Sequence, residues 1–87
     1  MSYLYILQSQ KNNRYYVGST NNLVRRLAEH NSGKTRSLKF IRPLVVVFSK
    51  TYPDIASARK AEILLKKSKS RIILEKIIKE GDIKLGP

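Results

Sequence analysis

The sequence predicts an α/β protein of the α+β type, a small three-stranded antiparallel sheet flanked by helices, with elements in the order β-β-α-β-α-α. Three features lead to this prediction. Two strand-like segments flank a short polar run, a further apolar run follows a proline, and three segments carry apolar residues at helical spacing. The 87 residues are expected to form one domain, spanning 1–87, because no linker divides the chain.

The first two strands are expected to form a β-hairpin. The segments Tyr3 to Gln8 and Arg14 to Ser19 are both strand-like, and the polar run 9–13 separates them. The third strand follows Pro43 and covers Leu44 to Phe48, five apolar residues without alternation. Such a run indicates a strand that is covered on both faces.

The first helix is predicted over Asn22 to His30. Either Thr20 or Asn21 is expected to cap it, because their side-chain oxygens can accept from the free N–H groups of the first turn. Leu23 and Leu27 are four residues apart and are predicted to face the core.

Two further helices complete the prediction. Pro53-Asp54 opens one that runs to about Lys67, and Ile72 to Lys79 forms the other. Gly33, which is suited to a left-handed backbone, is expected to end the first helix, and Gly81 is expected to stop the third. The predicted apolar stripes are Ala58, Ala61, Leu64 and Leu65 on the second helix and Ile73, Leu74, Ile77 and Ile78 on the third.

The charge of the chain points to an anionic partner. Eighteen lysines and arginines stand against six acids, for a formal net charge of +12. No acid precedes Glu29 and none lies between Glu29 and Asp54, whereas four bases fall in the first stretch and five in the second. Long acid-free stretches suit a surface that faces phosphate groups.

The absence of cysteine excludes disulfides, thiolate nucleophiles and thiolate metal sites. A cytoplasmic location is therefore expected. No run approaches the length of a membrane span, and the N-terminal residues lack the features of a signal peptide, so no membrane partner is expected.

Five side chains suited to acid-base or phosphate chemistry lie on different predicted elements. Tyr5 and Tyr16 lie on the hairpin strands, Arg26 and His30 on the first helix, and Glu62 on the second. Arg26 and His30 are four residues apart and so share one helix face. We therefore expect a polar helix face beside the hairpin.

In this order the motifs resemble those of the GIY-YIG nuclease superfamily, specifically its compact single-domain bacterial members. Tyr3-Leu4-Tyr5 stands where the family has Gly-Ile-Tyr, and Tyr16-Val17-Gly18 stands where it has Tyr-Ile-Gly. The segment Ser19 to His30 fits the family's helix signature, and Glu62 falls at the position of its metal-binding glutamate. The family's fold is similar to the one predicted above.

The resemblance implies hydrolysis of phosphodiester bonds with one divalent cation, Mg²⁺ or Mn²⁺, held by Glu62. Such ions prefer oxygen ligands and keep several waters, so one carboxylate and the substrate phosphate suffice. Arg26 is then expected to bind phosphate oxygens. By the family's proposed roles, Tyr16 accepts the proton of the attacking water, while Tyr5 and His30 orient the reacting groups. A phenol ordinarily titrates near pH 10, so the rate should rise with pH above neutrality.

Taken singly, each of these residues has an ordinary structural explanation. Tyrosines suit half-buried strands, an arginine suits a solvated helix, and a histidine suits a helix C-terminus. Glu62 stands three residues after Arg59 and four before Lys66, so a surface ion pair also explains it. The combination, rather than any one residue, favours catalysis.

The predicted partner is nucleic acid, with DNA favoured over RNA. Relatives often carry a separate DNA-binding domain, for which this chain has no room, so we expect selection by nucleic-acid structure, in DNA repair or processing. A noncatalytic DNA- or RNA-binding module and a ribosome-associated protein are the alternatives. The oligomeric state is left open. The residues expected to contact the backbone, unless their loop is merely solvated, are Lys34, Arg36, Lys39 and Arg42.

Overall fold

The computed structural model describes residues 1–33, 41–68 and 71–81. The elements follow the predicted order, so the α+β prediction is confirmed. Their bounds are β1 (Ser2–Ser9), β2 (Tyr15–Thr20), α1 (Leu23–Asn31), β3 (Leu44–Tyr52), α2 (Ile55–Ser68) and α3 (Arg71–Glu80).

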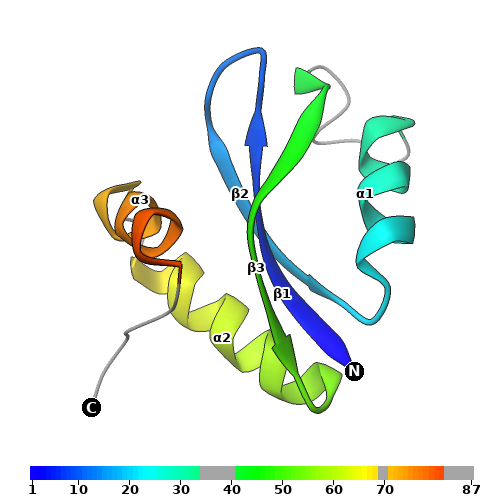
Figure 1. The fold of residues 1–87 in the computed structure, drawn as a ribbon, viewed down its shortest axis with the longest axis vertical. Helices are drawn as coiled ribbons and strands as arrows, with labels where there is room; N and C mark the ends of the chain where they lie inside the picture. The colour runs from blue at the N-terminus through cyan, green and yellow to red at the C-terminus, as the bar shows by residue number, and fades with distance from the viewer. Residues whose placement is uncertain (34–40, 69–70, 82–87) are drawn as a thin grey trace.

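β1 is the middle strand of an antiparallel sheet with the order β2-β1-β3. Figure 1 shows α1 on one side of this sheet and α2 with α3 on the other. Successive side chains of β1 therefore enter two separate cores. Leu4 and Ile6 are buried toward α2 and α3, whereas Tyr5 and Leu7 are buried toward α1. This explains why the strand is apolar on both faces.

The third strand is longer than predicted. It continues beyond the apolar run 44–48 as far as Tyr52, because β1 finds a backbone partner along its whole length and Ser2 pairs with Tyr52. The polar residues of this second half are tolerated because β3 lies at an edge of the sheet.

A register shift explains why the apolar run of β3 does not alternate. Ile6 pairs with Phe48 but Leu7 pairs with Val46, which leaves Val47 as an extra residue. Val46 packs on the α1 side of the sheet, whereas Val47 and Phe48 both belong to the core under α2 and α3. The strand is thus covered on both faces, as predicted.

The helix cap was predicted at the wrong residue. Asn22, rather than Thr20 or Asn21, is the N-cap of α1, and its side chain accepts from the Arg25 N–H at 3.0 Å. The backbone of Asn22 is extended, with φ −146° and ψ 94°, as a cap requires. Thr20 is still part of β2, and its hydroxyl accepts from the Asn22 N–H at 3.1 Å.

The apolar stripe of α2 was predicted correctly except at Leu64. Ala58, Ala61 and Leu65 pack in the core, but Leu64 is 57% exposed. Leu64 lies about 100° around the helix axis from Leu65, and on α2 this step carries its side chain out of the core and into solvent. Gly33 has the expected positive φ, at 88°, and Gly81, which follows α3 as predicted, also has a positive φ, at 73°. The stripe of α3 is confirmed at Ile73, Leu74, Ile77 and Ile78.

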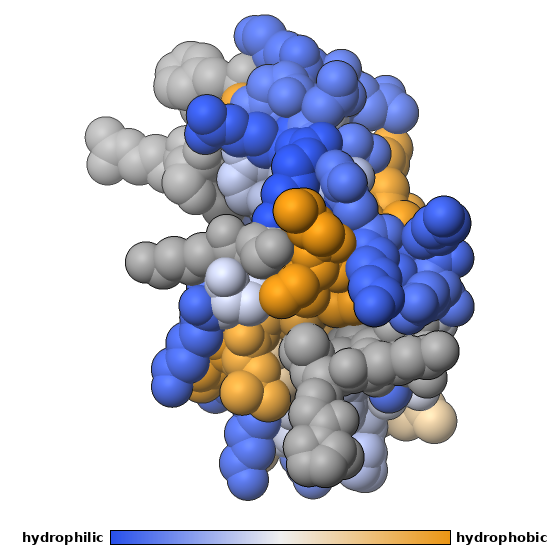
Figure 2. Space-filling model, turned by 90° about the vertical axis from the view of Figure 1, so that its left-hand side faces the viewer, coloured by the Kyte–Doolittle hydropathy of each residue, from blue (hydrophilic) through white to orange (hydrophobic). Residues whose placement is uncertain are grey.

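The face formed by α2 and α3 is mostly hydrophilic, with smaller apolar areas (Figure 2). Exposed apolar side chains on these helices include Ile63, Leu64 and Ile72. In the part of the chain that the structure describes, no helix combines the length and the apolar character needed to cross a membrane.

Asn31, the last residue of α1, attaches this helix to the start of β3. Its amide Nδ2 donates to the Leu44 carbonyl at 3.0 Å, and its Oδ1 accepts from the Leu44 N–H at 2.7 Å. The side chain thus satisfies backbone groups of an edge strand that would otherwise need water or another strand. Because α1 carries Arg26 and His30, this contact also fixes the helix that presents them.

Replacing Asn31 by alanine is expected to lower the free energy of unfolding by roughly 1–3 kcal/mol, because two hydrogen bonds to the backbone of Leu44 are lost. Urea denaturation measures the change. Asn21→Ala is the matched control, since Asn21 is exposed and has no described side-chain contact. Equal stability of the two variants would show that the bridge contributes nothing.

Candidate functional site

A cleft of about 610 Å³ runs along β2 and brings together all five predicted site residues. They come from β1, β2, α1 and α2, and they are Tyr5, Tyr16, Arg26, His30 and Glu62. Of the predicted backbone-binding residues, Lys34, Arg36 and Lys39 lie outside the described residues. Arg42 does not line the cleft, and its Nη1 donates to the Asn31 carbonyl at 3.2 Å.

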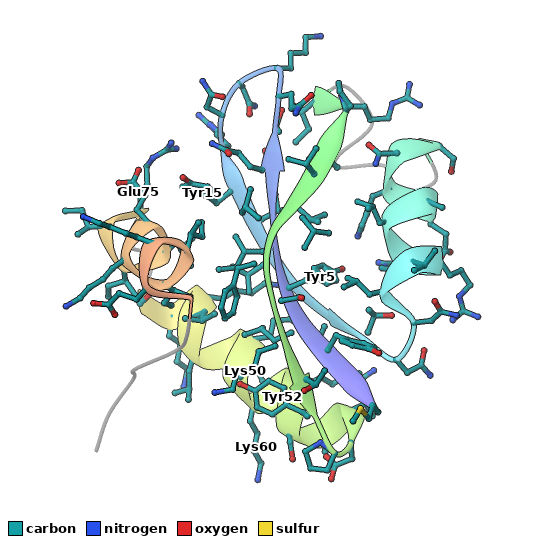
Figure 3. The ribbon with its side chains drawn as sticks, viewed as in Figure 1. Tyr5, Tyr15, Lys50, Tyr52, Lys60 and Glu75 are labelled. Atoms are coloured by element: carbon teal, nitrogen blue, oxygen red, sulfur yellow. The ribbon has the colours of Figure 1, made fainter. Side chains whose placement is uncertain are left out.

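The cleft joins two faces of the sheet because β2 is an edge strand. Side chains alternate along β2, so Tyr16 packs toward α1 whereas Tyr15 packs toward α2 and α3. Figure 3 shows the same division for Tyr5 and Tyr15, which lie on opposite sides of the sheet. Glu62 approaches from α2, and the other four predicted residues approach from the α1 side. Only at an edge of the sheet can these two groups meet.

Gly18 allows the Tyr5 side chain to lie across β2. The two residues are paired in the sheet register, and a Cβ at Gly18 would overlap the Tyr5 hydroxyl and ring. A side chain at this position would therefore displace the phenol. This close approach is a specific structural reason for the glycine in Tyr16-Val17-Gly18.

Tyr5 and His30 form a buried pair. The Tyr5 hydroxyl lies 3.1 Å from His30 Nε2, and the two residues are only 4% exposed. Burial is the main factor that raises the pKa of Tyr5 above its ordinary value, although Arg26 opposes this shift. Burial also lowers the pKa of His30, and the positive charge of Arg26 adds to the effect. Both groups are therefore neutral near pH 7.

Both oxygens of the Glu62 carboxylate have partners. The Ser19 hydroxyl donates to Oε1 at 2.5 Å, and Lys66 Nζ lies 2.6 Å from Oε2. The Lys66 pair matches the alternative suggested by the sequence, but the Glu62 side chain is only 19% exposed and so is not an ordinary surface acid. The two contacts hold the carboxylate in the lining of the cleft.

The cleft is strongly basic. Among the described residues that line it, the only acid is Glu62, and the four bases are Arg14, Arg26, Lys66 and Arg71. The charges act across the strand, since Arg26, Glu62 and Lys66 all influence the pKa of Tyr5. A phosphate group would therefore be attracted to this cleft.

Comparison with known proteins identifies the family. The sequence model described as the GIY-YIG catalytic domain matches residues 1–77. The chain belongs to the GIY-YIG family. The resemblance seen in the motifs is thus confirmed, and membership points to nuclease chemistry on a nucleic-acid substrate.

Curated relatives of this GIY-YIG domain are named UPF0213 proteins. One from Lactiplantibacillus plantarum is 40% identical over 73 residues, which cover 80% of this chain and 71% of the relative. Another from Streptococcus pneumoniae is 36% identical, with coverage of 78% and 69%. A third, from Xanthomonas campestris, is 45% identical over 74% of this chain and 63% of its own length. No solved structure matches the chain significantly.

The donor set of this GIY-YIG domain suits a hard divalent cation bound by one carboxylate. Within the described ranges, no three His, Cys, Asp or Glu side chains gather into a metal cage. Glu62 offers carboxylate oxygens beside the Ser19 hydroxyl, in a cleft open to a phosphate. Mg²⁺ commonly binds through one or two carboxylates, substrate phosphate and water. The residues present therefore fit such an ion.

Sequence reasoning missed several residues that line the cleft. Ser19 was not assigned as a partner of Glu62, although it directly follows Gly18 and its side chain must point to the opposite face. Arg14 and Arg71 were not singled out either. Arg71 lies far from the motifs in sequence, and only the packing of α3 on the sheet brings it to β2.

Proposed function

We propose that this GIY-YIG domain is a metal-dependent endonuclease that hydrolyses phosphodiester bonds, acting on DNA in preference to RNA, in DNA repair or processing. The observation that carries the proposal is the meeting of the five family-motif side chains in one basic cleft. An ordinary arrangement of surface residues would not bring groups from four elements to one place.

Arg26 and Glu62 have complementary roles in this proposal. Arg26 binds the non-bridging oxygens of the phosphate and stabilises the charge that develops on them. Glu62 holds the divalent cation, which supplies Lewis-acid stabilisation of the same phosphate when it is bound. Ser19 orients the Glu62 carboxylate by its hydrogen bond to Oε1.

The two tyrosines have different roles. Burial raises the pKa of Tyr5, so its hydroxyl stays protonated and positions His30, with which it makes a hydrogen bond. Tyr16 is half-buried and lines the cleft next to Gly18. It is therefore the tyrosine that accepts the proton of the attacking water.

The proposed contacts with phosphate oxygens favour selection of a substrate by its nucleic-acid structure rather than by its base sequence. The four basic side chains of the cleft suit phosphate oxygens, which are the same for every nucleotide. Contacts of this kind fix the position of a nucleic-acid backbone but carry no direct sequence information.

The decisive test uses purified protein with labelled duplex, branched, nicked and single-stranded DNA, and with the corresponding RNAs. Each substrate is incubated with Mg²⁺, Mn²⁺ or EDTA. Cleavage that needs the metal and stops in EDTA would support the proposal. Salt-sensitive binding without cleavage on any substrate would instead identify a noncatalytic module with the same fold.

Replacing Tyr16 by phenylalanine removes the proton acceptor but keeps the ring. The single-turnover rate is expected to fall on the order of 10²-fold and to lose its rise above neutral pH. A pH profile of single-turnover cleavage measures both effects. Tyr52→Phe is the control, because Tyr52 is half-buried on β3 and does not line the cleft. An unchanged profile in Tyr16→Phe would assign the proton transfer to another group.

Replacing Lys66 by methionine is expected to tighten divalent-metal binding about two- to five-fold. Lys66 Nζ lies 2.6 Å from Glu62 Oε2, so a cation bound at this carboxylate must compete with the ammonium group. Titration with Mn²⁺, followed by electron paramagnetic resonance without nucleic acid, measures the affinity. Lys67→Met is the control, since Lys67 is exposed and lies outside the cleft. Equal affinities of the two variants would rule out the competition.

A further inference from the structure

The α3 end of the cleft holds an arginine in a fixed position. The guanidinium carbon of Arg71 lies 4.6 Å from the centre of the Tyr15 ring, and Arg71 Nε donates to Glu75 Oε1 at 2.8 Å. Figure 3 shows Tyr15 and Glu75 near one another between β2 and α3. Two different contacts thus restrain a side chain that usually moves freely in solvent.

The two contacts leave part of the guanidinium group available. One uses the face of the group and the other uses Nε, so neither engages the two terminal nitrogens of Arg71. Arg71 remains about half exposed, at 51% of its side-chain area. A pre-positioned guanidinium with free terminal N–H groups is well suited to the oxygens of a phosphodiester.

The charges around Arg71 also favour an anionic ligand. Arg14 and Lys66 line the same cleft, while Glu75 does not line it. Glu62 is the only carboxylate among the described lining residues; it belongs to the Ser19 end of the cleft and already has Ser19 and Lys66 as partners.

We propose that Arg71 forms a second phosphodiester-binding site, which holds the nucleic-acid backbone on the α3 side of β2. Between Glu62 and Arg71 the backbone then runs along the edge strand β2, from the Ser19 end of the cleft to the Tyr15 end. This inference rests on the proposed function for its substrate, and it assigns binding to a residue outside the predicted loop 34–42.

The register of β2 gives the distance between the two sites. Tyr15 marks the Arg71 end, and Ser19, four residues later on the same face, marks the Glu62 end. At about 3.3 Å per residue the two positions lie about 13 Å apart. A stacked nucleic-acid strand advances about 3.4 Å per nucleotide. The second site therefore contacts a phosphate about four nucleotides away from the phosphate beside Glu62. This second phosphate lies either 5′ or 3′ of the first, but not on both sides.

An ordinary surface ion pair is the competing explanation. Arg71 and Glu75 are four residues apart on α3 and equally exposed, and such exposed pairs contribute little to the stability of a helix. The two explanations differ in the expected effect of Glu75. If the ion pair only stabilises α3, substitution of Arg71 and substitution of Glu75 should have the same effect on DNA binding. If Arg71 binds phosphate, losing Glu75 removes a competing carboxylate and leaves the binding group in place.

The test measures DNA binding by fluorescence anisotropy in EDTA, so that no cleavage occurs, at several salt concentrations. Arg71→Gln is expected to weaken binding about tenfold and to reduce the magnitude of the salt slope by about 1. Glu75→Gln is expected to bind as well as the parent or better. Arg59→Gln is the matched control for loss of one positive charge, because Arg59 is exposed on α2 and lies outside the cleft.

Substrate length provides the second measurement. Oligonucleotides are shortened stepwise on the 5′ or the 3′ side of the cleaved bond, and binding is measured with the parent and with Arg71→Gln. The difference in affinity between the parent and Arg71→Gln should disappear when the substrate is shortened below about four nucleotides on one side of the cleaved bond, but not when it is shortened on the other side. A difference that persists at every length would overturn the placement.

The outcomes separate the second site from the proposed function. Equal losses in Arg71→Gln and Arg59→Gln, or equal losses in Arg71→Gln and Glu75→Gln, would overturn the second site. A specific loss in Arg71→Gln combined with no cleavage by the parent on any substrate would support the site and contradict the nuclease proposal. Circular dichroism and thermal melting establish that each variant is folded as the parent is.

Discussion

Glutamine in place of Glu62 is expected to reduce cleavage by a factor on the order of 10³ or more while nucleic-acid binding survives. The substitution keeps the size of the side chain and its contact with Ser19, but it removes the carboxylate charge that would hold the divalent cation. Single-turnover cleavage in Mg²⁺ measures the rate, and anisotropy in EDTA measures binding. Because Glu62 is the only acid among the described lining residues, binding should be unchanged or slightly tighter.

Glu80→Gln is the matched control for this experiment, because Glu80 is an exposed acid at the end of α3 and does not line the cleft. It should cut like the parent. Thermal melting of Glu62→Gln tests whether loss of the Lys66 ion pair has destabilised α2. If Glu62→Gln retains the parental rate at every metal concentration, Glu62 does not hold the catalytic metal.

Local chemistry accounts for most of what the sequence could predict about the fold. The uninterrupted apolar character of β1 follows from its central place in the sheet, and the glycines after α1 and α3 have the backbone conformation that ends a helix. The errors are local as well. The N-cap is displaced to Asn22 because Thr20 is still needed by β2, and Leu64 is exposed because the buried stripe of α2 is narrower than its apolar sequence.

The candidate site was predictable as a set of residues but not as a shape. The motifs identified Tyr5, Tyr16, Arg26, His30 and Glu62, and the structure brings them to one cleft. That Glu62 reaches them from the opposite face depends on β2 being an edge strand, which is a property of the sheet order rather than of any motif.

Two further properties of the site depend on tertiary contacts alone. Tyr5 lies across Gly18, and this arrangement follows from the pairing of β1 with β2. Arg71 reaches Tyr15 only after α3 has packed on the core through residues such as Ile77. The spacing of these residues along the chain contains no information about such contacts.

Alanine in place of Arg26 is expected to lower kcat by a factor on the order of 10² to 10³, which is typical for loss of one pre-positioned donor to developing charge. Lysine should restore little of the rate, because an ammonium group cannot reproduce the planar fork of the guanidinium. Arg25→Ala is the matched control, since Arg25 is the neighbouring arginine of α1, pairs with Glu29 at 3.9 Å and does not line the cleft.

The titration of His30 provides a readout of Arg26→Ala that does not depend on activity. Burial is the larger cause of the lowered pKa of His30, and the charge of Arg26 lowers it further, so removal of that charge should raise the pKa part of the way toward the ordinary value of about 6.5. His30 is the only histidine of the chain, so its ring signals can be followed by NMR without ambiguity. An upward shift in Arg26→Ala, absent in Arg25→Ala, would place the guanidinium beside His30 in solution. A slow variant whose His30 titrates as in the parent would contradict the geometry on which the phosphate-binding role of Arg26 rests.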